Sequence, residues 1–213
     1  MVAGRMTRRE RERQQHISHI LGVAEGMFAQ KGFFRTTMKQ IARKAEFALG
    51  TIYAYFRSKR RLYEKVIEAK TVGLADFVTQ EMASGSSAQD QIEKFIQSKM
   101  AFLHRNRSFL RMYVAELGAP RLDSGQVVPK AARESYDSLL HHLTEAIRLG
   151  IQEGSLKFMN PEVLARAIDG LTTAVAVSWL RLRTWPSVEA ETRVATELLL
   201  RGAAVRFQEQ DVT

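Results

Sequence analysis

Cysteine is absent from this chain of 213 residues, and proline is rare, with only 4. The absence of cysteine excludes disulfide bonds, thiolate chemistry and cysteine-based zinc sites. Because proline interrupts helices, its scarcity leaves room for long helical segments. Uncharged stretches such as Gly170 to Leu180 stay well short of the roughly 20 residues that span a bilayer. We therefore expect a soluble, cytoplasmic protein with no signal peptide and no membrane partner.

Acidic residues are scarce only in the first third of the chain. Residues 1 to 70 hold 16 Lys and Arg against 6 Asp and Glu, a net charge of +10, whereas residues 71 to 213 hold 16 against 17. A basic domain joined to a nearly neutral one is typical of a nucleic-acid-binding protein with a separate sensing body. An anionic membrane surface is the rival partner. It is disfavoured because the basic residues do not line one face of an amphipathic helix opposite an apolar stripe.

The segment from Thr36 to Leu62 carries the most informative pattern. Apolar residues recur at i, i+3, i+4 and i+7, the spacing of one helix face, at Met38, Ile41, Ala42 and Ala45. Thr37 followed by Gln40 fits a capping box, which predicts that this helix begins directly after Thr37. The periodicity breaks after Lys44, and this break predicts a tight turn.

A second short helix is predicted from Ala48 to about Tyr55, with Ile52 and Phe56 facing inward beside Phe47. Its outer side combines small residues with hydroxyl groups, namely Leu49, Gly50, Thr51, Tyr53, Ala54 and Tyr55. Such a helix can approach another surface closely and still offer hydrogen bonds.

The next helix is predicted to begin after Ser58, a favourable N-cap residue. Its first turn is Lys59-Arg60-Arg61, which places three cations where the helix dipole is already positive. Two interpretations remain at this point: an external anion such as phosphate binds over the helix start, or the cations are solvated and screened by salt.

These residues resemble the DNA-binding region of the TetR family of bacterial transcriptional regulators. The matching positions, at fixed spacing, are Gly32-Phe33, Thr36-Thr37, Ile41-Ala42, Ala45, Gly50-Thr51-Ile52-Tyr53, Tyr55-Phe56, Lys59 and Leu62. Two positions depart from the family pattern. Glu46 replaces the usual turn glycine, at a cost of roughly 1 to 2 kcal/mol if it is left-handed. Ala48 replaces the usual capping serine, at a cost of about 1 kcal/mol.

The resemblance implies an all-α protein that binds a near-palindromic operator in double-stranded DNA as a dimer and acts as a repressor. We expect residues 14 to 58 to form the helix-turn-helix domain and residues 59 to 213 to form a ligand-binding and dimerisation domain. The residues expected to face the major groove are Leu49, Gly50, Thr51, Tyr53, Ala54 and Tyr55. Thr36, Thr37 and Lys59 are expected to anchor phosphates. Changes at Lys59 should therefore weaken binding to every sequence, and changes at Thr51 should alter sequence preference.

Further helices are predicted along the rest of the chain. A long helix runs from Ser58 to about Met82, and helices follow around residues 92 to 103, from 108 to 118, and to about Gln152, with a loop over residues 121 to 129. Asn160-Pro161 opens a helix to about Arg183, and a last helix begins at Ser187. Small residues on the last two helices predict a homodimer through a four-helix interface, and the alternative is a core within one chain.

The resemblance also implies a pocket for a small, largely apolar effector in the second domain. The candidate lining residues are Phe102, Phe109, Met112, Tyr113, Tyr136, Leu140, His141 and Trp179, and the alternative is that they are ordinary core residues. Three arginines would either hold a ligand carboxylate or lie on the surface: Arg105, Arg107 and Arg111. A drug-like cation, a fatty acyl compound and an aromatic acid all remain open as effectors.

Three further features of the sequence bear on its function. Residues 1 to 13 are expected to form a basic arm, which either enters a minor groove or is a disordered tail. His16 and His19 have metal-ligand spacing but no third ligand nearby in sequence, so no metal and no cofactor are expected. No catalytic spacing stands out, so an enzyme is disfavoured. A non-specific architectural DNA-binding protein remains the alternative function.

Overall fold

The computed structural model describes residues 6–118 and 128–203, and this part of the chain is built from helices, which confirms the all-α prediction. Three helices form a compact head at the N-terminal end: α1 (Arg8–Arg35), α2 (Met38–Lys44) and α3 (Leu49–Phe56). The remaining elements form the body: α4 (Lys59–Ala83), α5 (Ala88–Arg105), α6 (Arg107–Gly118), α7 (Lys130–Gln152), α8 (Pro161–Ser178), the short 3-10 helix η1 (Trp179–Arg181) and α9 (Val188–Ala203).

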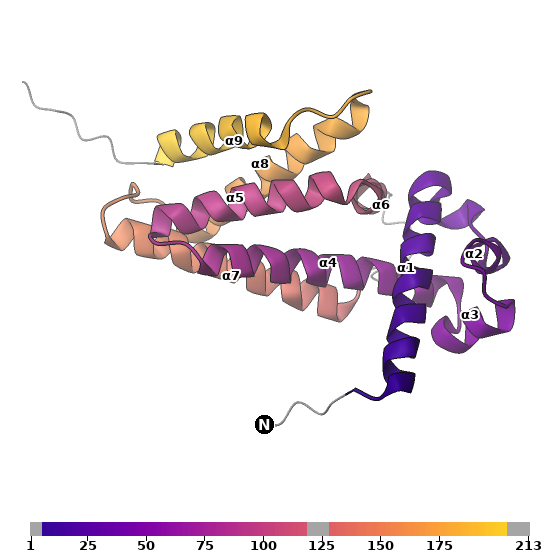
Figure 1. The fold of residues 1–213 in the computed structure, drawn as a ribbon. Coiled ribbons are helices and arrows are strands. Elements are labelled where there is room, and N and C mark those ends of the chain that lie inside the picture. Colours follow the sequence, from indigo (N-terminus) through magenta and orange to yellow (C-terminus); the bar gives the residue numbers. More distant parts are fainter. Residues whose placement is uncertain (1–5, 119–127, 204–213) are drawn as a thin grey trace, which may run out of the picture.

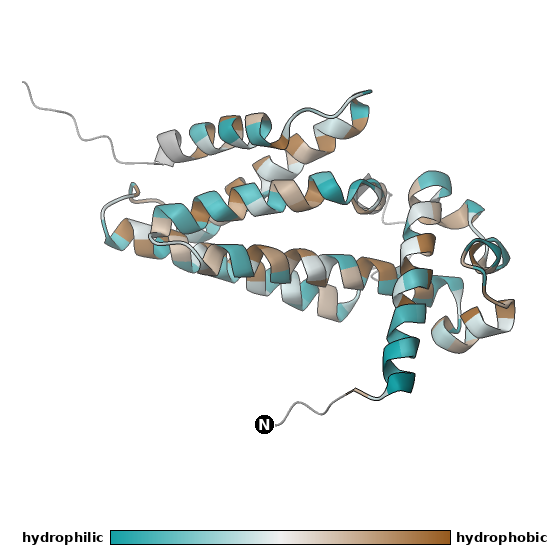
Figure 2. Cartoon of the chain, in the orientation of Figure 1, coloured by the Kyte–Doolittle hydropathy of each residue, from teal (hydrophilic) through white to brown (hydrophobic). Residues whose placement is uncertain are grey.

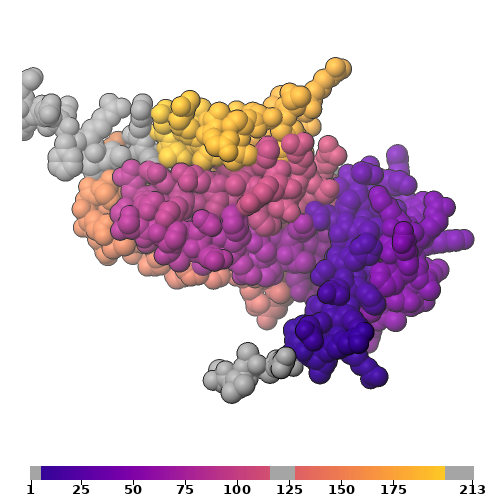
Figure 3. All heavy atoms as spheres, viewed as in Figure 1, coloured from indigo at the N-terminus to yellow at the C-terminus, as the bar shows by residue number. Residues whose placement is uncertain are grey.

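The long helices of the body lie roughly side by side, and the head sits at one end of them (Figure 1). Helix α4 links the two parts, since it packs against α1 and also against α5 and α7. Helix α6 also contacts α1, so the head rests on two elements of the body. The space-filling view shows the head in continuous contact with the body (Figure 3).

One hydrophobic core runs through both parts. Ile20 and Phe28 of α1 and Leu62 of α4 belong to the same cluster as Phe95 of α5 and Leu143 of α7. Apolar residues face the core while hydrophilic residues cover the outer sides of the helices (Figure 2). Because the core is continuous, a movement of helices in the body can reach the head through contacting side chains.

Capping signals read from the sequence are realised. Thr37 and Gln40 form the predicted capping box, with the Thr37 hydroxyl accepting from the Gln40 amide at 3.2 Å. Ser58 accepts from the amide of Arg61 at 3.2 Å, and Asn160 accepts from the amide of Val163 at 2.9 Å. Three helices therefore begin where their caps predict.

The predicted flexible arm over residues 1 to 13 is wrong for its second half. Helix α1 begins at Arg8, and a capping box between Thr7 and Glu10 starts it. An ion pair between Arg8 and Glu12, one turn apart, extends along its first turns. These local signals favour helix over coil, so residues 8 to 13 continue α1. Residues 1 to 5 lie outside the described residues, as does most of the predicted loop over 121 to 129.

Helix α8 is shorter than predicted, because the backbone tightens into η1 at Trp179 and leaves the helix before Arg183. The segment Pro161–Arg181 is long and apolar enough to cross a membrane by length and composition. One side of α8 is nevertheless buried against α5 and α7, through residues that include Ala165, Ile168 and Ala176. Its apolar character is therefore partly that of a core helix.

Candidate nucleic-acid interface

The turn between α2 and α3 places Glu46 in the left-handed region, with a φ of 59°. The Phe47 amide donates to the Ala42 carbonyl at 3.0 Å and closes the turn. The predicted strain at Glu46 is thus present, because a side chain occupies a conformation that favours glycine. Ala48 precedes α3 and makes no side-chain cap hydrogen bond, also as predicted.

Helix α3 is held by its inner side and presents its outer side to solvent. Ile52 and Phe56 are buried in the head core. On the outer side Leu49 is 39% exposed, Tyr53 is 45% exposed, and Gly50 and Ala54 are exposed as well. Thr51 is half-buried. Four of the predicted groove-facing residues therefore form one accessible surface with Thr51 at its edge.

Tyr55 lies differently from the prediction. It is half-buried, and its phenol oxygen is 3.2 Å from Nδ1 of His16 on α1. The His16 ring also packs edge-on against Phe47, with centroids 5.0 Å apart. Because Tyr55 follows the buried Ile52 by three residues, it lies on the flank nearest the core, where it joins α3 to α1.

The prediction that Thr36 anchors phosphate is wrong. Its side chain is fully buried, and its hydroxyl donates to the Gly32 carbonyl at 2.8 Å. Gly32, with a φ of 77°, breaks the helical backbone and exposes that carbonyl to Thr36. Thr37 is exposed, although its hydroxyl already accepts from Gln40 in the capping box.

Lys59 is also committed to the fold. Its ammonium group donates to the carbonyls of Phe33 at 2.8 Å and Thr36 at 2.9 Å, and lies 4.4 Å from the centre of the Phe33 ring. These carbonyls end α1, where the helix dipole is negative and favours a cation. The expected role of Lys59 as a phosphate anchor is thus not supported, because its donors are used within the head.

The three cations at the start of α4 have partners inside the chain. Arg60 and Arg61 both pair with Glu64 one turn later, at 3.0 and 2.9 Å. Lys59 is held as described above. The side chains at this helix start are therefore accounted for without an external anion, and Glu64 is the residue that supplies the counter-charge.

Sequence reasoning overlooked a different set of cations. Lys39, Arg43 and Lys44 are exposed on α2, and Arg57 is exposed at the end of α3 with a φ of 53°. Within the described part of the chain these four side chains form no ion pair. The available signal was their spacing, since Lys39 lies between the buried Met38 and Ile41, and Arg43 and Lys44 lie between the buried Ala42 and Ala45.

The predicted effector residues are only partly brought together. The Tyr136 hydroxyl donates to Asp169 at 2.6 Å, and burial together with the charge of Asp169 raises the pKa of the half-buried Tyr113. The others are core or flanking residues: Phe109, Met112 and Trp179 are buried, and Phe102 and Leu140 are half-buried. His141 is wrong as a lining residue, because its side chain is 70% exposed on the side of α7 opposite Leu139 and Leu143.

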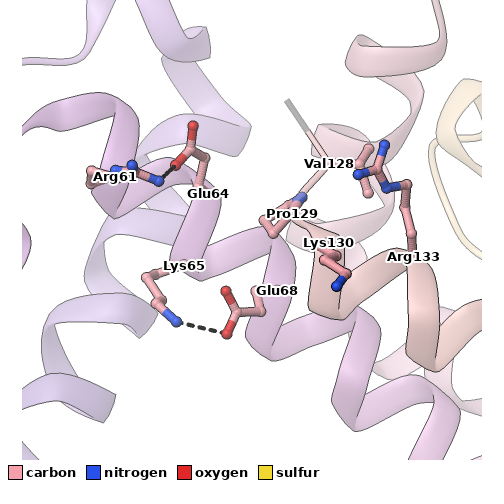
Figure 4. Close-up of a pocket in the computed structure, with 8 residues that line it drawn as sticks. All are labelled: Arg61, Glu64, Lys65, Glu68, Val128, Pro129, Lys130 and Arg133. Atoms are coloured by element: carbon pink, nitrogen blue, oxygen red, sulfur yellow. Dashed lines mark hydrogen bonds and ion pairs between the residues drawn. The ribbon is translucent and has the colours of Figure 1, made fainter. Parts of the chain in front are cut away.

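A groove of about 320 Å³ separates the start of α4 from the start of α7 (Figure 4). It is lined by Arg61, Glu64, Lys65, Glu68, Val128, Pro129, Lys130 and Arg133. Figure 4 shows Arg61 and Lys65 turned toward the glutamates of their own helix. The groove is charged and does not match the apolar effector pocket that the sequence predicts. No cluster of three metal-ligating side chains occurs among residues 6–118 and 128–203.

Comparison with known proteins supplies independent findings. Residues 20–66 match the model of bacterial regulatory proteins of the tetR family. The chain is 23% identical to the HTH-type transcriptional repressor KstR2 of Rhodococcus jostii, over 88% of this chain and 90% of that protein. Its fold is similar to that of a tetR-family regulatory protein from Rhodococcus RHA1, with a TM-score of 0.77, 21% identity and coverage of 90% and 98%. It is also similar to the regulator FadR of Bacillus subtilis in complex with stearoyl-CoA, with a TM-score of 0.74, 20% identity and coverage of 87% and 98%.

Proposed function

The chain belongs to the tetR family of bacterial transcriptional regulators, which are not enzymes, and we propose that it represses transcription as an operator-binding homodimer released by a small, largely apolar effector. In this proposal the head reads DNA, and the body from residue 59 onward dimerises and binds the effector. The cytoplasm, where the DNA lies, is the proposed location.

The observation that carries the proposal is the outer surface of α3. Leu49, Gly50, Tyr53 and Ala54 are accessible there, while Ile52 and Phe56 fix the helix to the head. A helix with small residues on its outer side can enter a major groove, and Leu49 and Ala54 suit contact with thymine methyl groups. Thr51 at the edge of this surface can bond a base edge, so its replacement should alter sequence preference.

Phosphate contacts are assigned to the unpaired cations around α3. Lys39, Arg43, Lys44 and Arg57 carry exposed charges that form no ion pair within the described residues. Basic side chains of this kind position a protein on the DNA backbone without reading its sequence. They replace Thr36 and Lys59 in the proposed interface, and Thr37 remains a candidate because it is exposed.

The outer sides of α8 and α9 support the proposed dimer. Apolar residues are exposed there, with Val194 at 54% and Leu198 at 65% on α9. The exposed side of α8 carries Ala167, Gly170 and Ala174, which allow another helix to approach closely. A two-fold axis through this surface would bury these residues and set the spacing of two α3 helices along the DNA.

Effector release requires contact between the body and the head, and α6 and α4 both provide it through α1. An effector weakens DNA binding if it binds more tightly to a conformation whose two heads are wrongly spaced for the operator. The extent of release is limited by the difference in effector affinity between the two conformations. The stearoyl-CoA complex of the FadR relative supports a small molecule with an apolar chain as the class of effector.

The test is fluorescence anisotropy of labelled DNA from the region upstream of the gene, compared with a scrambled duplex across a salt series. We expect the native fragment to bind on the order of a thousandfold more tightly, with two protomers per site. Equal binding to both duplexes, lost together as salt rises, would instead indicate a non-specific architectural protein.

A further inference from the structure

The body contains a buried charge that the DNA-binding surface does not use. The ammonium group of Lys99 on α5 donates to the backbone carbonyl of Asp169 and to the Thr173 hydroxyl, both at 2.8 Å, and also to Oδ1 of Asp169. Tyr136 on α7 donates to the same Oδ1 at 2.6 Å. Helices α5, α7 and α8 therefore meet at one polar cluster within the apolar core.

Nearly every donor in this cluster is already used. The three N–H groups of Lys99 have acceptors, Tyr136 donates to Asp169, and Thr173 donates to the Asp169 carbonyl at 2.8 Å. By contrast, within the described part of the chain Oδ2 of Asp169 receives no hydrogen bond. Each carboxylate oxygen can accept two hydrogen bonds, so Oδ2 has unused acceptor capacity, and the Asp169 side chain as a whole retains 17% exposure.

A second phenol lies on α6, a helix that contacts α8. Tyr113 on α6 is half-buried, and no residue of the described ranges forms a hydrogen bond with its hydroxyl. Burial and the charge of Asp169 raise the pKa of Tyr113, so the phenol stays protonated. The cluster thus offers a free carboxylate oxygen and a free hydroxyl, while its positive charge is fully paired.

The unused oxygen of Asp169 and the unused hydroxyl of Tyr113 favour some ligand head groups over others. A carboxylate would face the negative oxygen of Asp169 and find its only unused donor at Tyr113. A hydroxyl or an ammonium group would donate to Asp169 and bond Tyr113, satisfying both. We propose that Asp169 and Tyr113 bind the hydrogen-bond-donating head group of an amphiphilic effector between α6 and α8. The proposal builds on the effector-responsive function above and names its ligand class.

The position of Tyr113 gives this binding a route to the DNA. Tyr113 lies on α6, and α6 contacts α1 of the head. A head group that joins Tyr113 to Asp169 constrains α6 relative to α8, and the head follows because it is packed on α6.

The test uses a matched series of octylamine, octanol and octanoate, which share one apolar tail. Binding to the full chain is measured by isothermal titration calorimetry without DNA, so the result does not depend on any operator. We expect octylamine and octanol to bind about tenfold or more tightly than octanoate. Octanoate binding as tightly as octylamine, or no binding by either donor, would overturn the proposal.

Two variants test the assignment to residues. Tyr113→Phe keeps the ring and should weaken the binding of octylamine and of octanol about fivefold. Ser138→Ala, which removes an exposed hydroxyl on α7, should leave both affinities unchanged. Lys99→Met combined with Asp169→Leu removes both buried charges together, which avoids leaving one unpaired. That double variant should fold and lose the preference for donors, and a preference that survives in it would overturn the assignment. If the parent chain binds its operator but shows no preference for octylamine and octanol over octanoate, the proposed regulator function stands and only the proposed ligand class is wrong.

Discussion

The ammonium group of Lys70 on α4 lies 3.0 Å from Oε2 of Glu25 on α1, and also donates to Asn106 at the end of α5 at 2.8 Å. Glu25 is buried, so this pair fastens the head to the body at a point with little access to water. Removing one partner leaves the other charge without compensation, which costs more than the pair itself contributes.

We therefore expect Lys70→Met to lower the free energy of unfolding by about 2 kcal/mol. The double variant Lys70→Met with Glu25→Gln should recover much of that loss, because no buried charge remains unpaired. Urea denaturation of the four proteins of this double-mutant cycle measures the coupling. Additive losses would show that the two side chains act independently.

Lys59→Ala should act mainly on the fold of the head. The variant loses donors to the carbonyls of Phe33 and Thr36, and we expect the free energy of unfolding to fall by about 1 to 2 kcal/mol. At temperatures where it remains folded, the salt dependence of its DNA binding should match that of the parent chain. A flatter salt dependence would instead indicate that Lys59 contacts phosphate, as the sequence predicts.

Arg43→Ala should show the opposite behaviour. Arg43 is exposed on α2 without an ion pair in the described residues, so its removal should change stability by no more than about 0.5 kcal/mol. If it contacts phosphate, binding to all duplexes weakens and the slope of log K against log salt falls by about 1. Anisotropy titrations over a salt series provide the measurement, with Arg133→Ala in the body as the control that leaves the slope unchanged.

Glu46→Gly should stabilise the protein. Glycine removes the strain of the left-handed conformation, which raises the free energy of unfolding by about 1 to 2 kcal/mol. Its greater conformational freedom in the unfolded chain lowers the free energy of unfolding by about 0.5 to 1 kcal/mol. The expected net gain is about 0.5 to 1 kcal/mol in thermal or urea unfolding. Glu46→Ala, which keeps the Cβ atom, is the matched control, and an equal gain in both variants would place the effect elsewhere.

Leu198→Asp should prevent dimer formation if the outer side of α9 is the interface. A charge on a residue that is buried between protomers removes apolar contact and is itself desolvated. Sedimentation velocity should then report a monomer, and operator binding should lose its two-protomer stoichiometry. Gln80→Asp, on the exposed side of α4, should leave the assembly unchanged.

The helices and their boundaries followed largely from local patterns. Thr37 with Gln40, Ser58 and Asn160 all cap helices, because a capping side chain bonds amides only two or three residues away. The predicted arm is wrong over residues 8 to 13 because a local signal of the same kind, the capping box between Thr7 and Glu10, starts α1 at Arg8.

The sequence by itself determined the all-α architecture, the turn at Glu46 and the exposed side of α3, because helical periodicity, caps and turn residues act over a few neighbouring positions. Only the tertiary structure decided what Thr36, Tyr55 and Lys59 do, since their partners come from α1. It also revealed the contact of Lys99 with Asp169, which are 70 residues apart. A threonine, tyrosine or lysine can contact DNA or another part of the same chain, and the packing of distant segments decides which of the two occurs.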